Sequence, residues 1–188
     1  MTVTWYVVRA SGVLAFVFLT VSVVLGLLLS GRARPERWPR FALEDVHGFA
    51  GVLAGVFIGV HGFGLLIDKY MPFSLVQLVV PGTSAYRPLA TACGIVAAEL
   101  LAALAVTNRL RRQIPHRLWR RAHYLNFAVW SLALAHGIAA GTDAGKLWAG
   151  LLYTLCVGTV AGFTVWRALG PHPPAPLNGN LAVFLASS

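Results

Sequence analysis

The sequence is poor in charge, and above all in acidic residues. Only 11% of its 188 residues are charged while 57% are hydrophobic, and six Asp and Glu stand against 15 Lys and Arg. A soluble domain carries about 25% charged residues, so the composition excludes an ordinary soluble protein and predicts an integral membrane protein. The net charge of +9 would suggest a nucleic-acid partner in a soluble protein. We expect no nucleic acid here, because the positive charges follow the membrane topology described below.

Cysteines and nucleotide-binding motifs are scarce as well. Cys93 and Cys156 each stand alone in an apolar run, which excludes a CxxC redox pair, a CxxCH attachment site and a disulfide framework. Nothing like GxGxxG follows a strand. The sequence therefore predicts no flavin or NADPH domain of its own, and we expect both cysteines to be packed as small apolar side chains.

Five apolar segments are each close to the length of a membrane-spanning helix. They cover residues 5–29, 45–67, 88–107, 118–140 and 146–166, and a span needs about 20 apolar residues. Backbone groups in lipid must be hydrogen-bonded within their own segment, so we expect helices. The predicted fold is an all-α integral membrane bundle of five transmembrane helices over residues 1–168. A Pro-rich tail covers 169–188, and a sixth span would have to lie there.

The distribution of Lys and Arg predicts the orientation of this bundle. Loops on the cytoplasmic side of a membrane protein carry an excess of basic residues. Eleven of the 15 fall on one side and four on the other, so we expect the N-terminus outside, the C-terminus in the cytoplasm, and the second and fourth spans parallel. The eleven are Arg32, Arg34, Arg37, Arg40, Arg109, Arg111, Arg112, Arg117, Arg120, Arg121 and Arg167; the four are Arg9, Lys69, Arg87 and Lys146.

Four histidines lie inside the two parallel spans. His47 and His61 are fourteen residues apart, and His123 and His136 are thirteen apart, which is roughly 20 Å along a helix. Each span therefore carries one imidazole near each membrane face, with His47 opposite His123 and His61 opposite His136. Ionisable groups at such depths are rare and usually functional. The pattern predicts two stacked bis-histidine haems between spans two and four, an inner iron on the first pair and an outer iron on the second.

Other interpretations of the histidines stay open. A lone histidine inside a membrane is often a hydrogen-bonding group between helices, and a zinc ion at the inner pair could add Glu44 or Asp45 as a ligand. The spacing of thirteen also places His123 and His136 about 140° apart on an ideal helix. Either the fourth span is distorted, or the two haems approach it from different sides.

Glycines lie beside the histidines of the second span. Taking His47 as zero, they fall between about 40° and 120° at 100° per residue. Such a smooth surface would accommodate a porphyrin, with Gly51 and Gly55 in its lining, or it would form a packing seam for another helix. The five glycines are Gly48, Gly51, Gly55, Gly59 and Gly62.

Basic and hydrogen-bonding residues close to the histidines are candidate partners for haem propionates. For the inner arginines, a purely topological role explains their position equally well. The inner candidates are Arg120 and Arg121, and further ones are Arg37 and Arg40. The outer candidates are Tyr86 and Arg87, and a further one is Arg9.

Two other features of the apolar segments bear on function. Glu99 lies near the middle of the third span, where a carboxyl could handle protons, contact a quinone, or bond to a neighbouring helix at Asn126 or Ser131. Residues 70–88 are too apolar for an exposed loop. We expect a short helix there that covers the outer histidine pair.

These features together resemble the ferric reductase-like transmembrane domain family. Haem-bearing modules of this family also occur in NADPH oxidases and in the membrane subunit of bacterial methionine sulfoxide reductase systems. The resemblance covers about residues 5–168. It rests on the two histidine spacings, on RASG at 9–12, on SAYRP at 84–88 and on LWRRAHYLNFAVW at 118–130.

The resemblance implies two b-type haems, electron passage across a bacterial plasma membrane, and often six spans. It implies an oxidoreductase subunit that depends on a separate flavoprotein or a quinol as donor, and on an exterior redox partner near His61 and His136. Flavin or quinone would come through such a partner. Two alternatives remain: a stand-alone ferric or oxygen reductase at the outer haem, and a non-redox transporter whose histidines handle metal or protons.

Overall fold

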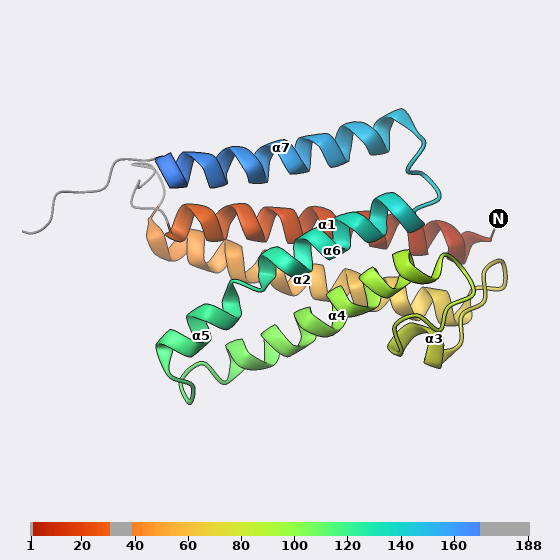
Figure 1. Ribbon diagram of the computed structural model, residues 1–188, viewed down its shortest axis with the longest axis horizontal. Helices are drawn as coiled ribbons and strands as arrows, with labels where there is room; N and C mark the ends of the chain where they lie inside the picture. Colours follow the sequence, from red (N-terminus) through yellow and green to blue (C-terminus); the bar gives the residue numbers. More distant parts are fainter. Residues whose placement is uncertain (1, 31–38, 170–188) are drawn as a thin grey trace, which may run out of the picture.

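Every regular element that the structure describes is a helix, which confirms the expected all-α class. The computed structural model describes residues 2–30 and 39–169 (Figure 1). The tail at 170–188 and Arg32, Arg34 and Arg37 lie outside the described residues. The helices are α1 (Val3–Ser30), α2 (Arg40–Ile67), α3 (Leu75–Val79), α4 (Pro88–Arg109), α5 (His116–His123), α6 (Asn126–Ala140) and α7 (Leu147–Leu169).

Four of these helices are long and apolar enough to cross a membrane. α1, α2, α4 and α7 contain 28, 28, 22 and 23 residues, and about 20 residues of helix cover a hydrocarbon core of about 30 Å. They correspond to four of the five predicted spans, with ends that differ by a few residues. They indicate a protein that resides in a lipid bilayer.

The remaining predicted span, 118–140, is divided into two helices. α5 ends at His123 and α6 begins at Asn126. Between them, Tyr124 and Leu125 donate their backbone N–H groups to carbonyls three residues earlier, at 3.2 and 2.9 Å, which is tighter than an α-helix. The side chain of Asn126 donates to the His123 carbonyl at 2.8 Å and thereby competes with the regular backbone ladder. α6 has 15 residues, about 22 Å, so it is shorter than the hydrocarbon core without α5.

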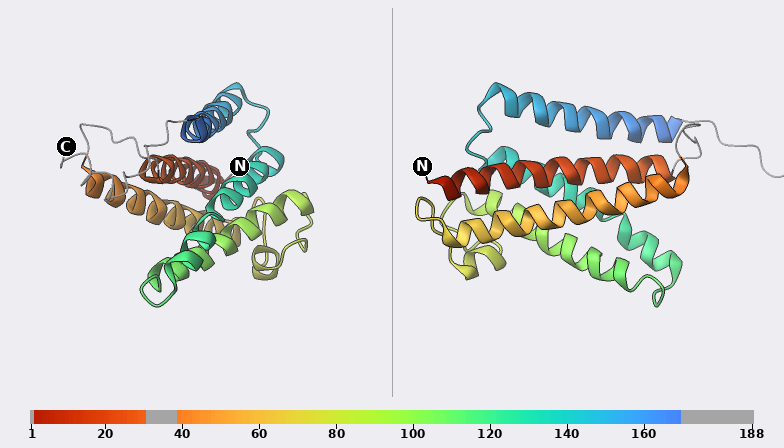
Figure 2. Two further views of the ribbon diagram at one scale, coloured as in Figure 1. Left: turned by 60° about the vertical axis from the view of Figure 1, so that its left-hand side comes forward. Right: turned by 180° about the vertical axis from the view of Figure 1, so that it is seen from behind.

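The helices associate as two close pairs, α1 with α2 and α4 with α6, and α7 packs against α1. α4 and α7 lie at opposite edges of the bundle (Figures 1 and 2). α2 and α6 run in the same direction, as predicted (Figure 1). The end of the bundle that contains α3 and the start of α1 is called the α3 end below. The opposite end, with the α4–α5 connection, is called the arginine end; it carries Arg109, Arg111, Arg112, Arg117, Arg120 and Arg121.

The predicted short helix in 70–88 is confirmed as α3. Ser74 caps it: its hydroxyl accepts from the Gln77 N–H at 3.3 Å, and the Gln77 side chain accepts from the Ser74 N–H at 3.0 Å. Beside it, Asp68 ends α2 and accepts the Thr2 hydroxyl and the Met71 N–H. Burial raises the pKa of Asp68, but these hydrogen bonds outweigh it and leave the pKa below its ordinary value. The carboxylate thus ties the N-terminus to the end of α2.

One buried hydrogen bond joins the two helix pairs in the core. Trp130 of α6 donates from Nε1 to the Thr20 hydroxyl of α1 at 2.9 Å, and both side chains are buried. The Trp130 ring also stacks on Phe16, with centroids 5.9 Å apart. Ala54 of α2, which is fully buried, lies in the same cluster. Aromatic stacking, a hydrogen bond and small side chains therefore hold α1, α2 and α6 together.

Thr20→Val is expected to destabilise the protein by about 1 kcal/mol, because the buried Trp130 N–H loses its acceptor. Reversible unfolding in mixed micelles measures the change. Thr159→Val is the matched control, since Thr159 is only half-buried and its hydroxyl bonds only to its own helix, at the Leu155 carbonyl. Equal losses for the two variants would contradict the role assigned to the Thr20 hydroxyl.

Candidate functional site

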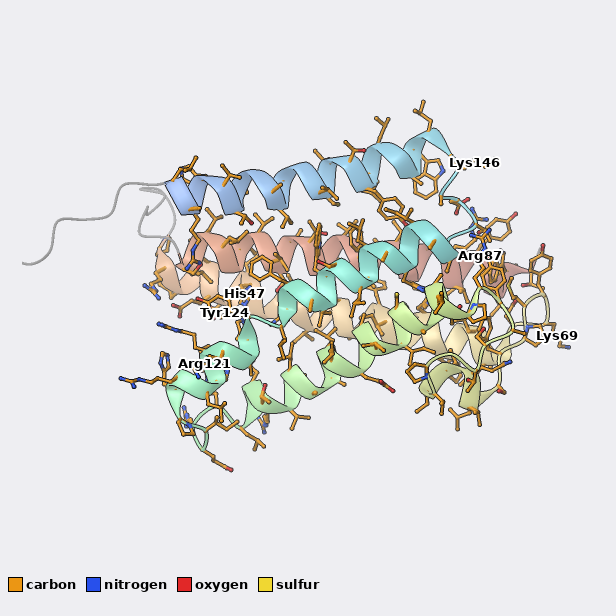
Figure 3. The ribbon with its side chains drawn as sticks, in the orientation of Figure 1. His47, Lys69, Arg87, Arg121, Tyr124 and Lys146 are labelled. Carbon is orange, nitrogen blue, oxygen red and sulfur yellow. The ribbon has the colours of Figure 1, made fainter. Side chains whose placement is uncertain are left out.

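The structure brings the four histidines together in two facing pairs. The rings of His47 and His123 have centroids 6.0 Å apart and planes at 67°, and those of His61 and His136 have centroids 6.3 Å apart and planes at 85°. His47 lies towards the arginine end, near Tyr124 and Arg121 (Figure 3). The fourteen residues between His47 and His61 place the second pair roughly 20 Å further along α2.

The break between α5 and α6 is what allows both pairs to form. On one continuous helix, His123 and His136 would point about 140° apart. The tightened turn at Tyr124 and Leu125 separates the helix that carries His123 from the one that carries His136. Of the two arrangements that the spacing leaves open, the structure has the distorted span.

Three of the four imidazoles donate from Nδ1 to a backbone carbonyl of the neighbouring helix. A carbonyl only accepts, so Nδ1 carries the hydrogen and Nε2 keeps its lone pair. Histidines that bind a metal through Nε2 are oriented in this way. Each of the three bonds measures 2.8 Å; they join His47 to the Ser22 carbonyl, His61 to Val8 and His136 to Ala90.

A glycine follows each accepting carbonyl by four residues. In a helix the side chain at position i+4 lies close to the carbonyl of residue i, and a glycine there leaves the carbonyl open to the imidazole. A Cβ at Gly94 would lie 2.6 Å from His136 Nδ1, and one at Gly12 would lie 3.0 Å from His61 Nδ1. At Gly26 the nearest imidazole atom, His47 Cε1, is 3.4 Å away. The pairs of carbonyl and glycine are Val8 and Gly12, Ser22 and Gly26, and Ala90 and Gly94.

These three glycines were not predicted from the sequence, although a signal was present. Gly12 and Gly26 are fourteen residues apart, the same interval that separates His47 from His61 on the antiparallel α2. Matched intervals on two neighbouring helices indicate repeated contacts between them. The glycines that were predicted to matter lie on α2, the helix of His47 and His61, whereas these three lie on the neighbouring helices that accept the hydrogen bonds.

His123 is oriented by stacking. The Trp119 ring lies nearly parallel to it, with centroids 5.1 Å apart and an interplanar angle of 25°. His116 contacts the other end of this stack, 5.7 Å from Trp119. His123 Nδ1 is 3.4 Å from the Asn126 amide, a long contact. A continuous row of rings therefore leads from the exposed His116 to the His47 and His123 pair.

The glycines predicted to line a groove face open space. A Cβ at Gly48, Gly55, Gly59 or Gly62 would meet nothing within 4 Å, and one at Gly51 would meet only the Ser22 hydroxyl, at 3.7 Å. Four of the five positions therefore do not pack against another described helix. Within the described residues, a packing seam along these glycines is therefore limited to Gly51.

Tyr86 and Arg87 contact the end of α6. The Tyr86 hydroxyl donates to the Ala140 carbonyl at 3.0 Å, and the Arg87 guanidinium donates to the Ala139 carbonyl. The guanidinium thereby lies at the negative end of the α6 dipole. Both residues thus cap the helix that carries His136, and this structural role was not foreseen.

The other predicted polar partners are spread over the two ends. Arg9 forms an ion pair with Asp143, with Nε 2.7 Å from Oδ2, and Arg40 pairs with Glu44 at 2.8 Å. Arg120 and Arg121 are exposed at the arginine end. The bond expected from Glu99 to Asn126 or Ser131 does not form: Glu99 is exposed, and the Asn126 amide donates to the His123 carbonyl.

A zinc site is not assembled within residues 2–30 and 39–169. No group of three or more His, Cys, Asp and Glu side chains gathers there, whereas a protein zinc site uses three or four such ligands. Glu44 and Asp45, considered as ligands beside His47, are both exposed. The pairs of imidazoles stand by themselves in an apolar bundle.

Comparisons with protein-family models, with curated proteins and with solved structures found no match to this chain. The geometry of the histidines therefore carries the functional argument.

Gly94→Ala is expected to destabilise the protein by about 1–3 kcal/mol, because the added methyl would overlap His136 and force it out of its hydrogen bond. Gly158→Ala on α7 is the control: nothing lies within 4 Å of its added Cβ, so the higher helix propensity of alanine should stabilise it slightly. Unfolding in mixed micelles measures both. Changes of the same sign and size would contradict the close contact at Gly94.

Proposed function

We propose that this protein carries electrons across a membrane through two b-type haems. One would be held by His47 and His123, and the other by His61 and His136. The observation that carries the proposal is the pair of imidazole separations. Metal–imidazole bonds of about 2 Å put two rings on opposite sides of one metal with centroids roughly 6 Å apart, and the two pairs measure 6.0 and 6.3 Å.

Three further features support haem as the group. The Nδ1 bonds of His47, His61 and His136 leave Nε2 free to bind iron. Among the residues that the structure describes, the pairs have no third or fourth side-chain ligand, as a bis-histidine haem requires. The glycine side of α2 faces open space beside the histidines, where a flat macrocycle would find room.

The residues of the chain would position and tune these sites. A haem with two axial histidines accepts and releases single electrons. The carbonyls that bond to Nδ1 increase the basicity of the imidazoles, and the apolar helices around them keep water away. The rings of Trp119 and His116 extend from His123 to the surface, so electrons would arrive at the arginine end and leave near His61 and His136.

We propose the orientation and the partners on the same basis. The arginine end would face the cytoplasm, with α5 and α6 together forming a fifth span. The donor would be a separate flavoprotein or a quinol, and an exterior redox partner would accept electrons at the α3 end. The resemblance to ferric reductase-like domains of bacterial plasma membranes agrees with this scheme.

A reduced-minus-oxidised spectrum of the purified protein tests the proposal directly. We expect low-spin b-type haem at two per chain. Leu at His61 or His136 should remove about half of it, and so should Leu at His47 or His123, because each iron loses one axial ligand. His116→Leu is the control, since His116 is exposed and belongs to neither pair; it should keep both haems.

Other outcomes would separate the alternatives. A protein that contains no haem would overturn the proposal in favour of a non-redox transporter, and a single haem per chain would overturn the two-site arrangement. Reoxidation of the reduced protein by a ferric chelate, without any partner, would identify a stand-alone reductase.

A further inference from the structure

Glu99 is an unpartnered carboxyl in the middle of a membrane-spanning helix. It lies eleven residues after Pro88 and ten before Arg109 in α4, about 15 Å from either end. Its side chain is exposed, and within residues 2–30 and 39–169 it has no hydrogen-bond or ion-pair partner. Too deep to reach water, a carboxyl at this position is costly in hydrocarbon unless another group bonds to it.

The partner of Glu99 has to come from outside the described chain. Ala97 and Leu104 of α4 are buried in the core, and Gly94 contacts His136. These three residues lie about 140° or more from Glu99 around the helix, at 100° per residue. Two other buried residues, Ile95 and Thr91, flank Glu99 on one side, about 40° and 80° away and one and two turns earlier. α4 forms an edge of the bundle, with no described helix on its outer side (Figures 1 and 2). Glu99 is itself exposed, and it lies on another side of α4 than Gly94, which faces His136.

We infer that the outer side of α4 is the interface with a second copy of this chain, with Glu99 close to a two-fold axis along the membrane normal. Two copies inserted in the same orientation place their Glu99 side chains at the same depth without any further matching. A protonated carboxyl both donates and accepts a hydrogen bond, so two of them form a reciprocal pair. A two-fold contact needs this self-complementarity.

The side chains around Glu99 allow two helices to approach closely. Ala102 and Ala103 are exposed and lie one turn further along the same side of α4, and Ala92 lies two turns before it. Val96 and the exposed Val106 complete this side. Small residues around a polar one are typical of helix contacts inside membranes. The alanines permit this close approach. The carboxyl needs a hydrogen-bond partner inside the membrane, and this need favours the approach. This interface is separate from the histidine sites and does not depend on the proposed function.

Self-association in lipid vesicles, followed by energy transfer between donor- and acceptor-labelled chains at decreasing protein-to-lipid ratio, tests the inference. The wild type should dimerise, and Glu99→Leu should weaken the dimer about tenfold, because the reciprocal pair is lost. Glu99→Gln should keep most of the affinity, since an amide also donates and accepts. Wild-type chains that remain monomeric, or a Leu variant that dimerises equally well, would overturn it.

Cross-linking locates the interface. In a background with Ala at Cys93 and Cys156, Ala103→Cys should form a disulfide-linked dimer in vesicles. Leu155→Cys, which is 68% exposed on α7, is the matched control and should react far more slowly. Equal cross-linking at the two positions would overturn the placement on α4. The test needs no haem, so its result is independent of the spectrum.

Discussion

A hydrogen bond between an imidazole Nδ1–H and the carbonyl of a neighbouring helix recurs three times in this protein, and the bundle is arranged around it. At His47, His61 and His136 the bond has the same length, 2.8 Å. Each time a glycine stands four residues after the acceptor, so that a carbonyl already used by the helix can accept a second donor. A buried imidazole without such a partner would be costly. The bond satisfies Nδ1 and directs Nε2 across the bundle.

This constraint explains why the helices associate in pairs. α1 supplies the carbonyls for both histidines of α2, and α4 supplies the carbonyl for His136 of α6, so α1 lies close to α2 and α4 close to α6. The Trp130 to Thr20 bond and the stacking on Phe16 join the pairs through the core. The imidazoles then face each other between α2 and the α5–α6 segment. An apolar bundle thus places two facing imidazole pairs at two levels along its length with few polar groups.

Acidic and basic side chains elsewhere in the described spans lie near the two ends, and Glu99 is the exception. The inner side of α4 serves the histidine site through Ala90 and Gly94, while its outer side carries Glu99 among alanines. A single helix thereby presents one polar contact inward and one outward. Because Gly94 and Glu99 lie about 140° apart around α4, association with a second copy through Glu99 would leave the histidine pairs undisturbed.

The amino-acid sequence alone was enough for the helical class, for most helix ends, and for the partners His47 with His123 and His61 with His136. The length of an apolar segment and the position of the arginines beside it are properties of that segment alone, so they predict a span and its direction without a structure. The break at Tyr124 and Leu125, the glycines at 12, 26 and 94, and the capping of α6 by Tyr86 and Arg87 were decided only by tertiary structure. They depend on how each helix is rotated about its axis and how closely it approaches its neighbour. The side chains of two helices set that rotation together, and no single segment contains this information.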